Sequence, residues 1–81
     1  MAMEQLPELR RGVYRHFKGR EYLVLSVARH SETGEPMVVY QALYAPFKIC
    51  ARPYAMFMSE VDREKYPAIK QKYRFEVVQE F

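Results

Sequence analysis

Residues 21–44, with the sequence EYLVLSVARHSETGEPMVVYQALY, contain two runs of β-forming residues separated by a short polar stretch. In the first run, Glu21 to His30, apolar side chains fall on both sets of alternating positions, so both faces of a strand there are expected to be partly covered. The polar stretch Ser31 to Pro36 contains a glycine and a proline, which favour a chain reversal. The second run, Met37 to Tyr44, is therefore predicted to pair antiparallel with the first as a hairpin.

A shorter strand is predicted before this hairpin. Residues 13–18 alternate with period two, and the apolar face of the strand is expected to hold Val13 and Phe17, interrupted by Arg15. The following Lys18-Gly19-Arg20 is short and contains a glycine that tolerates positive φ. This strand should therefore be the antiparallel neighbour of residues 21–30.

Two more strands and a helical segment are predicted after the hairpin. Residues 47–52 alternate and end at Pro53, as expected of a third antiparallel neighbour. The pattern then changes, and a short helical segment is expected near residues 54–66, with Met56-Phe57-Met58 closing one end of the core and Asp62 capping a turn. Residues 75–78 are predicted to form the closing strand.

These elements predict a mainly β protein, a small SH3-like antiparallel barrel of about five strands. Short antiparallel strands leave exposed edges unless the sheet curls, and a barrel removes most of them. A twisted sheet with one helix packed against it is the alternative. Residues 1–11 are expected to be an N-terminal lead-in, and residues 12–81 a single small β-barrel domain.

Composition predicts a soluble chain that folds around one core. Hydrophobic residues make up 49% and charged residues 28%, which excludes the low hydrophobicity and high net charge of disordered chains. No apolar run is long enough to serve as a signal peptide or to span a membrane. Contact with membranes is therefore not expected. Cys50 has no second cysteine to pair with, which favours the reducing cytoplasm.

Several ordered blocks of the sequence resemble a known family. The blocks are Gly12-Val13-Tyr14-Arg15-His16-Phe17-Lys18-Gly19, Tyr22-x-Val24, Ala28-Arg29-His30-Ser31-Glu32-Thr33-x-Glu35, Val38-Val39-Tyr40-x-x-Leu43-Tyr44 and Arg52-Pro53-x-x-Met56-Phe57. Over residues 12–75 the chain resembles the bacterial family called domain of unknown function 1653. The resemblance implies a stand-alone cytoplasmic bacterial protein, similar to small SH3-like β proteins, and it brings no catalytic residues to transfer. At Cys50 the sequence departs from the aromatic residue expected of relatives.

The densest polar chemistry lies around the predicted hairpin turn. Arg29 and His30 are suited to carboxylate or phosphate groups, and Glu32 and Thr33 add further polar atoms. The alternative is that these side chains hydrogen-bond the backbone of the turn itself. The candidate ligand-binding residues are Arg29, His30, Glu32, Thr33, Arg52, His16 and Tyr40.

Some of the same residues, together with Cys50, could also form a metal site or a catalytic site. His16, His30 and Glu32 together would suit a facial metal site, but their spacing does not define that geometry. A catalytic role for Cys50 needs a neighbouring base, which the sequence does not place. No catalytic residue, metal or cofactor is therefore assigned, and a metal- or ligand-dependent enzyme is the third hypothesis.

Charge and aromatic residues define the two leading hypotheses. Residues 1–20 carry five basic and two acidic side chains, whereas residues 21–81 carry eight of each. Tyrosines interleave with basic residues between positions 14 and 54, a pattern that in small barrels binds nucleic acid. We predict a non-enzymatic binding or interaction module for an unknown protein or a small polar ligand, with a nucleic-acid-binding barrel as the alternative. A homodimer is compatible with the small size.

Overall fold

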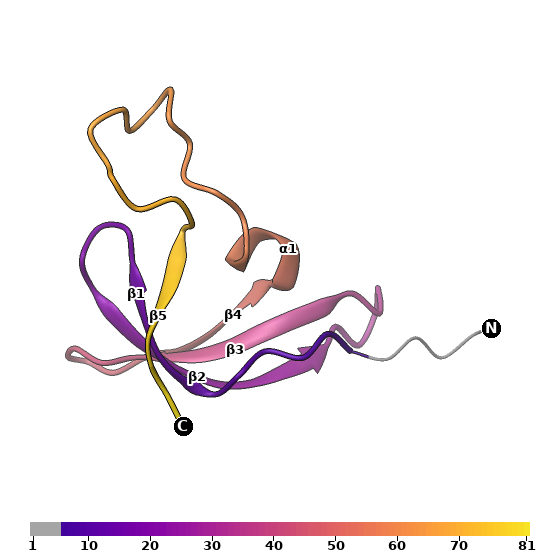
Figure 1. Ribbon diagram of the computed structural model, residues 1–81. Coiled ribbons are helices and arrows are strands. Elements are labelled where there is room, and N and C mark those ends of the chain that lie inside the picture. Colours follow the sequence, from indigo (N-terminus) through magenta and orange to yellow (C-terminus); the bar gives the residue numbers. More distant parts are fainter. Residues whose placement is uncertain (1–5) are drawn as a thin grey trace.

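The computed structural model describes residues 6–81, and they form one antiparallel sheet with a single helical turn (Figure 1). The elements are β1 Gly12–His16, β2 Glu21–Arg29, β3 Pro36–Ala42, β4 Ile49–Pro53, α1 Tyr54–Phe57 and β5 Phe75–Glu80. The five strands lie in the order β4-β3-β2-β1-β5, and all neighbours are antiparallel. The prediction of a mainly β fold with five strands and a short helix is confirmed.

The predicted closure into a barrel does not form. Strands β4 and β5 are the two edges of the sheet and do not pair with each other. Aromatic side chains connect these edges instead, because Phe57 of α1 stacks on Phe75 of β5 with ring centroids 4.1 Å apart. The result is an open, curved sheet with one helical turn packed over its concave side (Figure 1), which is the alternative that the sequence suggested.

The concave face of the sheet carries the core. The pairing of β2 with β3 shifts between Val24 and Ser26, and the pairing of β1 with β5 shifts between Val13 and Tyr14. Such bulges bend strands and increase their twist. The buried cluster inside the curve consists of Tyr14, Val24, Val38, Tyr40, Phe57 and Phe75.

The predicted inner face of β1 is wrong. Tyr14 is buried at 6% exposure, whereas Val13 and Phe17 are only partly buried. The tyrosine fits the core because its ring lies edge-on to Phe57 and its hydroxyl donates a hydrogen bond to the carbonyl of Arg10. His16, two residues further along the strand, therefore also points to the concave side.

Residues 58–74 leave the sheet as a long excursion above β1 and β5 (Figure 1). The helix predicted near residues 54–66 ends at Phe57, and residues 62–66 form one hydrogen-bonded turn in which the side chain of Asp62 accepts from the amides of Glu64 and Lys65. The segment returns beside the β1–β2 turn, where the amide of Phe17 donates to the carbonyl of Arg74. Within residues 6–81, no helix is long and apolar enough to cross a membrane.

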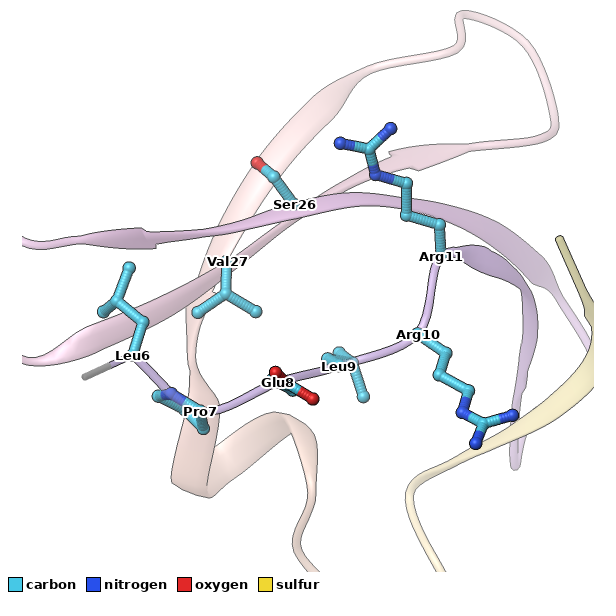
Figure 2. A pocket seen from close by; sticks show the side chains of 8 residues that line it. All are labelled: Leu6, Pro7, Glu8, Leu9, Arg10, Arg11, Ser26 and Val27. Carbon is cyan, nitrogen blue, oxygen red and sulfur yellow. The ribbon is translucent and has the colours of Figure 1, made fainter.

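The lead-in segment runs beside β2. Figure 2 shows residues 6–11 along this strand, with Leu6 and Arg11 flanking Ser26 and Val27. These residues line a pocket of about 390 Å³. Arg10 extends the other way and pairs with Glu80 of β5 at 2.7 Å. The predicted lead-in thus packs against the domain over its described part, and residues 1–5 lie outside the described residues.

Candidate functional site

A pocket of about 330 Å³ opens where the β1–β2 turn, β4 and residues 58–74 meet. It is lined by His16, Phe17, Lys18, Arg52, Asp62, Lys65, Tyr66 and Arg74. Three separate parts of the chain therefore contribute to one concave surface, which we call the basic pocket.

Positive charge dominates the basic pocket. Lys18, Arg52, Lys65 and Arg74 are its cations, and Asp62 is the one carboxylate among the described lining residues. The ion pairs of residues 6–81 lie elsewhere, between Arg10 and Glu80 and between Arg15 and Glu21, so none of these four cations has an acidic partner within that range. The basic pocket thus holds an excess of positive charge.

Arg52 is held in place by an aromatic ring. Its guanidinium lies 5.5 Å from the ring centroid of Phe75, which is buried and stacked on Phe57. A cation over a ring face is attracted by the quadrupole of the ring, and the contact leaves the planar N–H donors to point outward. Arg74 is positioned differently, because its Nε donates to the hydroxyl of Ser59 at 3.2 Å.

His16 is a neutral donor in this surface. Its Nδ1 accepts a hydrogen bond from the amide of Lys18 at 3.1 Å, so the neutral ring carries its proton on Nε2. Burial first, and then the charges of Arg52, Arg74 and Lys18, lower the pKa of His16 from 6.5 to about 4. At neutral pH the imidazole can therefore donate a hydrogen bond without adding to the charge of the pocket.

This shift predicts a stability loss at mildly acidic pH. As the pH falls below about 6.5, the unfolded chain binds a proton at His16 that the folded chain does not bind until about pH 4. The free energy of unfolding therefore decreases as the pH is lowered from about 6.5 to about 4. Above about pH 6.5 His16 is neutral in both the folded and the unfolded chain, so it does not change the free energy of unfolding with pH. We expect the melting temperature of the wild type to fall more than that of His16→Gln between about pH 7 and pH 4.5. If the melting temperatures of the wild type and of His16→Gln fell equally over this pH range, the lowered pKa of His16 would be contradicted.

A second pocket, of about 250 Å³, adjoins the basic pocket through Arg52. It is lined by Tyr22, Tyr40, Ala42, Tyr44, Pro46, Lys48, Cys50 and Arg52. The hydroxyls of Tyr22 and Tyr44 are hydrogen-bonded at 2.8 Å, and burial together with that bond raises the pKa of Tyr22 to about 12. We call this surface the tyrosine pocket.

The candidate residues of the hairpin turn lie apart from both pockets. Arg29 Nη1 donates to the carbonyl of Gly34 at 2.9 Å, and His30 Nδ1 accepts from the amides of Glu32 and Thr33 at 3.1 and 3.2 Å. Thr33 Oγ1 accepts from the following Glu35 amide. These contacts organise the turn, which is the alternative that the sequence analysis raised.

The structure divides the seven candidates into two groups. His16, Tyr40 and Arg52 are brought together around the two pockets, whereas Arg29, His30, Glu32 and Thr33 lie at the other end of β2. His16 precedes β2 and His30 follows it, so the two histidines do not share a site. Residues 6–81 contain no group of three side chains suited to hold a metal.

Sequence reasoning missed most of the residues that line the basic pocket, namely Phe17, Lys18, Asp62, Lys65, Tyr66 and Arg74. The last four come from the excursion 58–74, whose position over the β1–β2 turn depends on long-range contacts such as the ring contact between Phe17 and Tyr66 at 4.9 Å. No local pattern carries that information. The clustering of basic residues near positions 70–74 was the one available signal.

Comparison with known proteins identifies related sequences. The family model described as "Protein of unknown function (DUF1653)" matches residues 12–77, which include every residue that lines either pocket. A crystal structure of a protein from Bordetella bronchiseptica that belongs to the same family is 37% identical, covering 91% of this chain and 92% of that chain with a TM-score of 0.76. The comparison with curated proteins finds no match.

Proposed function

Because this chain belongs to the family of proteins of unknown function DUF1653, we propose a function from its own site: a non-enzymatic module that binds an anionic group in the basic pocket. The observation that carries the proposal is the convergence of Lys18, Arg52, Lys65 and Arg74 on one pocket with Asp62 as the opposing carboxylate. The gathered groups are charges and hydrogen-bond donors, which suit binding better than covalent chemistry.

Electrostatics favour an anion as the ligand. Like charges held close together destabilise each other, and a bound anion relieves that repulsion. The guanidinium of Arg52 has a planar fork that matches phosphate or carboxylate oxygens, and its contact with Phe75 limits its motion. His16 Nε2 adds a neutral donor beside it. A bound anion also raises the pKa of His16, because it opposes the three positive charges that depress it.

The test is a titration with inorganic pyrophosphate at low salt, followed by amide chemical shifts in NMR spectra. We expect shifts around residues 16–18, 52 and 62–74. Arg52→Gln should weaken binding by about tenfold to a hundredfold, because a hydrogen-bonded charge contributes roughly 1.5–3 kcal/mol. Affinity should also fall as salt is added, since the contacts are electrostatic.

Arg11→Gln is the matched control, because it removes the same charge from the lead-in segment outside the basic pocket (Figure 2). Its affinity should stay within about twofold of the wild type. Should Arg52→Gln fail to fold, Lys65→Gln replaces it, since Lys65 is exposed. An absence of binding at low salt, or equal losses in Arg52→Gln and Arg11→Gln, would refute the proposal.

Two finer assignments belong to the same proposal. An SH3-like fold is supported by five antiparallel strands with a helical turn between the last two, although β4 and β5 leave the sheet open. A bacterial cytoplasm is supported by the relative from Bordetella bronchiseptica and by Cys50, which has no second cysteine with which to form a disulfide. The fold by itself does not assign a function.

A further inference from the structure

The tyrosine pocket and the basic pocket lie on either side of Arg52, which lines both, and we treat them as the two halves of one surface. One half offers cations and the neutral His16, and the other offers aromatic rings with hydroxyl groups. A ligand that occupies both halves must carry an anionic group next to a flat ring with polar edges. This inference rests on the proposed function, since it extends the ligand of the basic pocket.

The rings of the tyrosine pocket are rigidly placed. Tyr22 lies edge-on to Tyr40 and Tyr44, with ring centroids 5.4 and 5.7 Å away, and its hydroxyl is bonded to that of Tyr44. Tyr40 is buried, whereas Tyr22 and Tyr44 are both partly buried, and a ligand that contacts Tyr44 shares its ring with the guanidinium of Arg20. Preorganised rings lose little conformational entropy when a ligand packs on them.

Basic side chains are also present at the tyrosine pocket. The guanidinium of Arg20 lies 4.2 Å from the ring centroid of Tyr44, and Lys48 lines the tyrosine pocket. Together with the four cations of the basic pocket, they make six basic groups, whereas Asp62 is the carboxylate among the described residues that line the two pockets. Six cations exceed what one phosphate needs, so the ligand is expected to carry several anionic groups.

We propose that this surface binds single-stranded nucleic acid, with a phosphate in the basic pocket near Arg52 and an adjacent base against Tyr44. A strand supplies repeated phosphates and, between them, unpaired bases whose edges can meet tyrosine hydroxyls. Proteins that bind single strands combine a positively charged groove with aromatic rings in this way. A duplex hides its bases and can use only the cations.

The test measures fluorescence anisotropy of labelled oligonucleotides of about eight residues, as oligouridine, oligothymidine and a duplex, from about 25 to 200 mM KCl. We expect the single strands to bind more tightly than the duplex and than pyrophosphate, with affinity falling steeply as salt rises. The uridine and thymidine strands distinguish RNA from DNA as the source of the same chemistry.

Variants separate the two halves of the surface. Tyr44→Ala should weaken oligonucleotide binding about tenfold and leave pyrophosphate binding unchanged, because base stacking on a ring is lost while the phosphate contacts remain. Tyr73→Ala is the control, since Tyr73 is exposed and lines neither pocket. If Tyr44→Ala does not fold, Lys48→Gln tests the same half, and it should reduce the salt dependence of strand binding by about one phosphate contact.

The outcomes distinguish this inference from the proposed function. Pyrophosphate binding that depends on Arg52, together with oligonucleotides that bind no more tightly and ignore Tyr44→Ala, would overturn the inference and leave the anion site standing. An absence of binding by both ligands would overturn both. Tighter binding of the duplex than of the single strands would also overturn the inference, because it would show that the bases are not contacted.

Discussion

Phe57→Ala is expected to destabilise the protein by about 3–5 kcal/mol, the usual range for truncating a buried Phe. The side chain is fully buried. It stacks on Phe75 at 4.1 Å and also contacts Tyr14 and Tyr40, with centroids 5.8 and 5.6 Å away. Because these contacts connect the two open edges of the sheet, truncation leaves a cavity where backbone pairing cannot compensate. A domain of this length has about 4–12 kcal/mol of stability, so little would remain.

Urea unfolding followed by circular dichroism measures this effect, and Met56→Ala is the control. Met56 lies one residue earlier in the same helix but is 50% exposed, so its truncation should cost at most about 0.5 kcal/mol. If Phe57→Ala does not fold at all, Phe57→Leu should give a measurable loss of stability, smaller than that expected for Phe57→Ala and larger than that of Met56→Ala. A loss at position 57 no larger than at position 56 would show that the ring does not hold the sheet edges together.

Gly12→Ala is expected to have the second largest effect, a loss of about 2–5 kcal/mol from overpacking combined with backbone strain. The φ angle of Gly12 is +157°, and a Cβ atom there would stand 2.1 Å from the carbonyl oxygen of Gln79. That oxygen belongs to the backbone of β5, so it cannot rotate away as a side chain would. Relief requires β1 and β5 to separate at the start of their pairing.

Gly34→Ala provides the comparison, because Gly34 has a φ of +79° but a Cβ atom added there would have no other atom within 4 Å. It should lose only about 1–2 kcal/mol, the cost of a left-handed conformation without a clash. Melting temperatures of the two variants measure the difference, at roughly 4–8 °C per kcal/mol for a domain of this size. Equal shifts would show that the approach of β5 to β1 is not tight in solution.

The candidate site is only partly predictable from sequence. Arg52, His16 and Tyr40 have side chains whose chemistry suits ligand binding, and the structure does bring them together. The turn that contains His30 has the same kind of chemistry, yet its polar atoms bond the local backbone. Residue type alone does not distinguish these cases, because His16 Nδ1 also accepts from a local amide, and only the position of His16 beside Arg52 and Arg74 in the folded chain separates it from His30.

The alternation of residues 21–44 and the glycine and proline between them determined the hairpin, and the same local rules placed the other strands and a helical segment after Pro53, although the helix ends at Phe57 and not near residue 66. Alternation and turn residues act between neighbours along the chain, so they can be read from the sequence without the tertiary structure. Only the tertiary structure decided that Tyr14 rather than Val13 faces the core and that Lys18, Arg52 and Arg74 meet. Burial and electrostatic repulsion are sums over atoms close in space, and the strand order that brings those atoms together is a property of the whole fold.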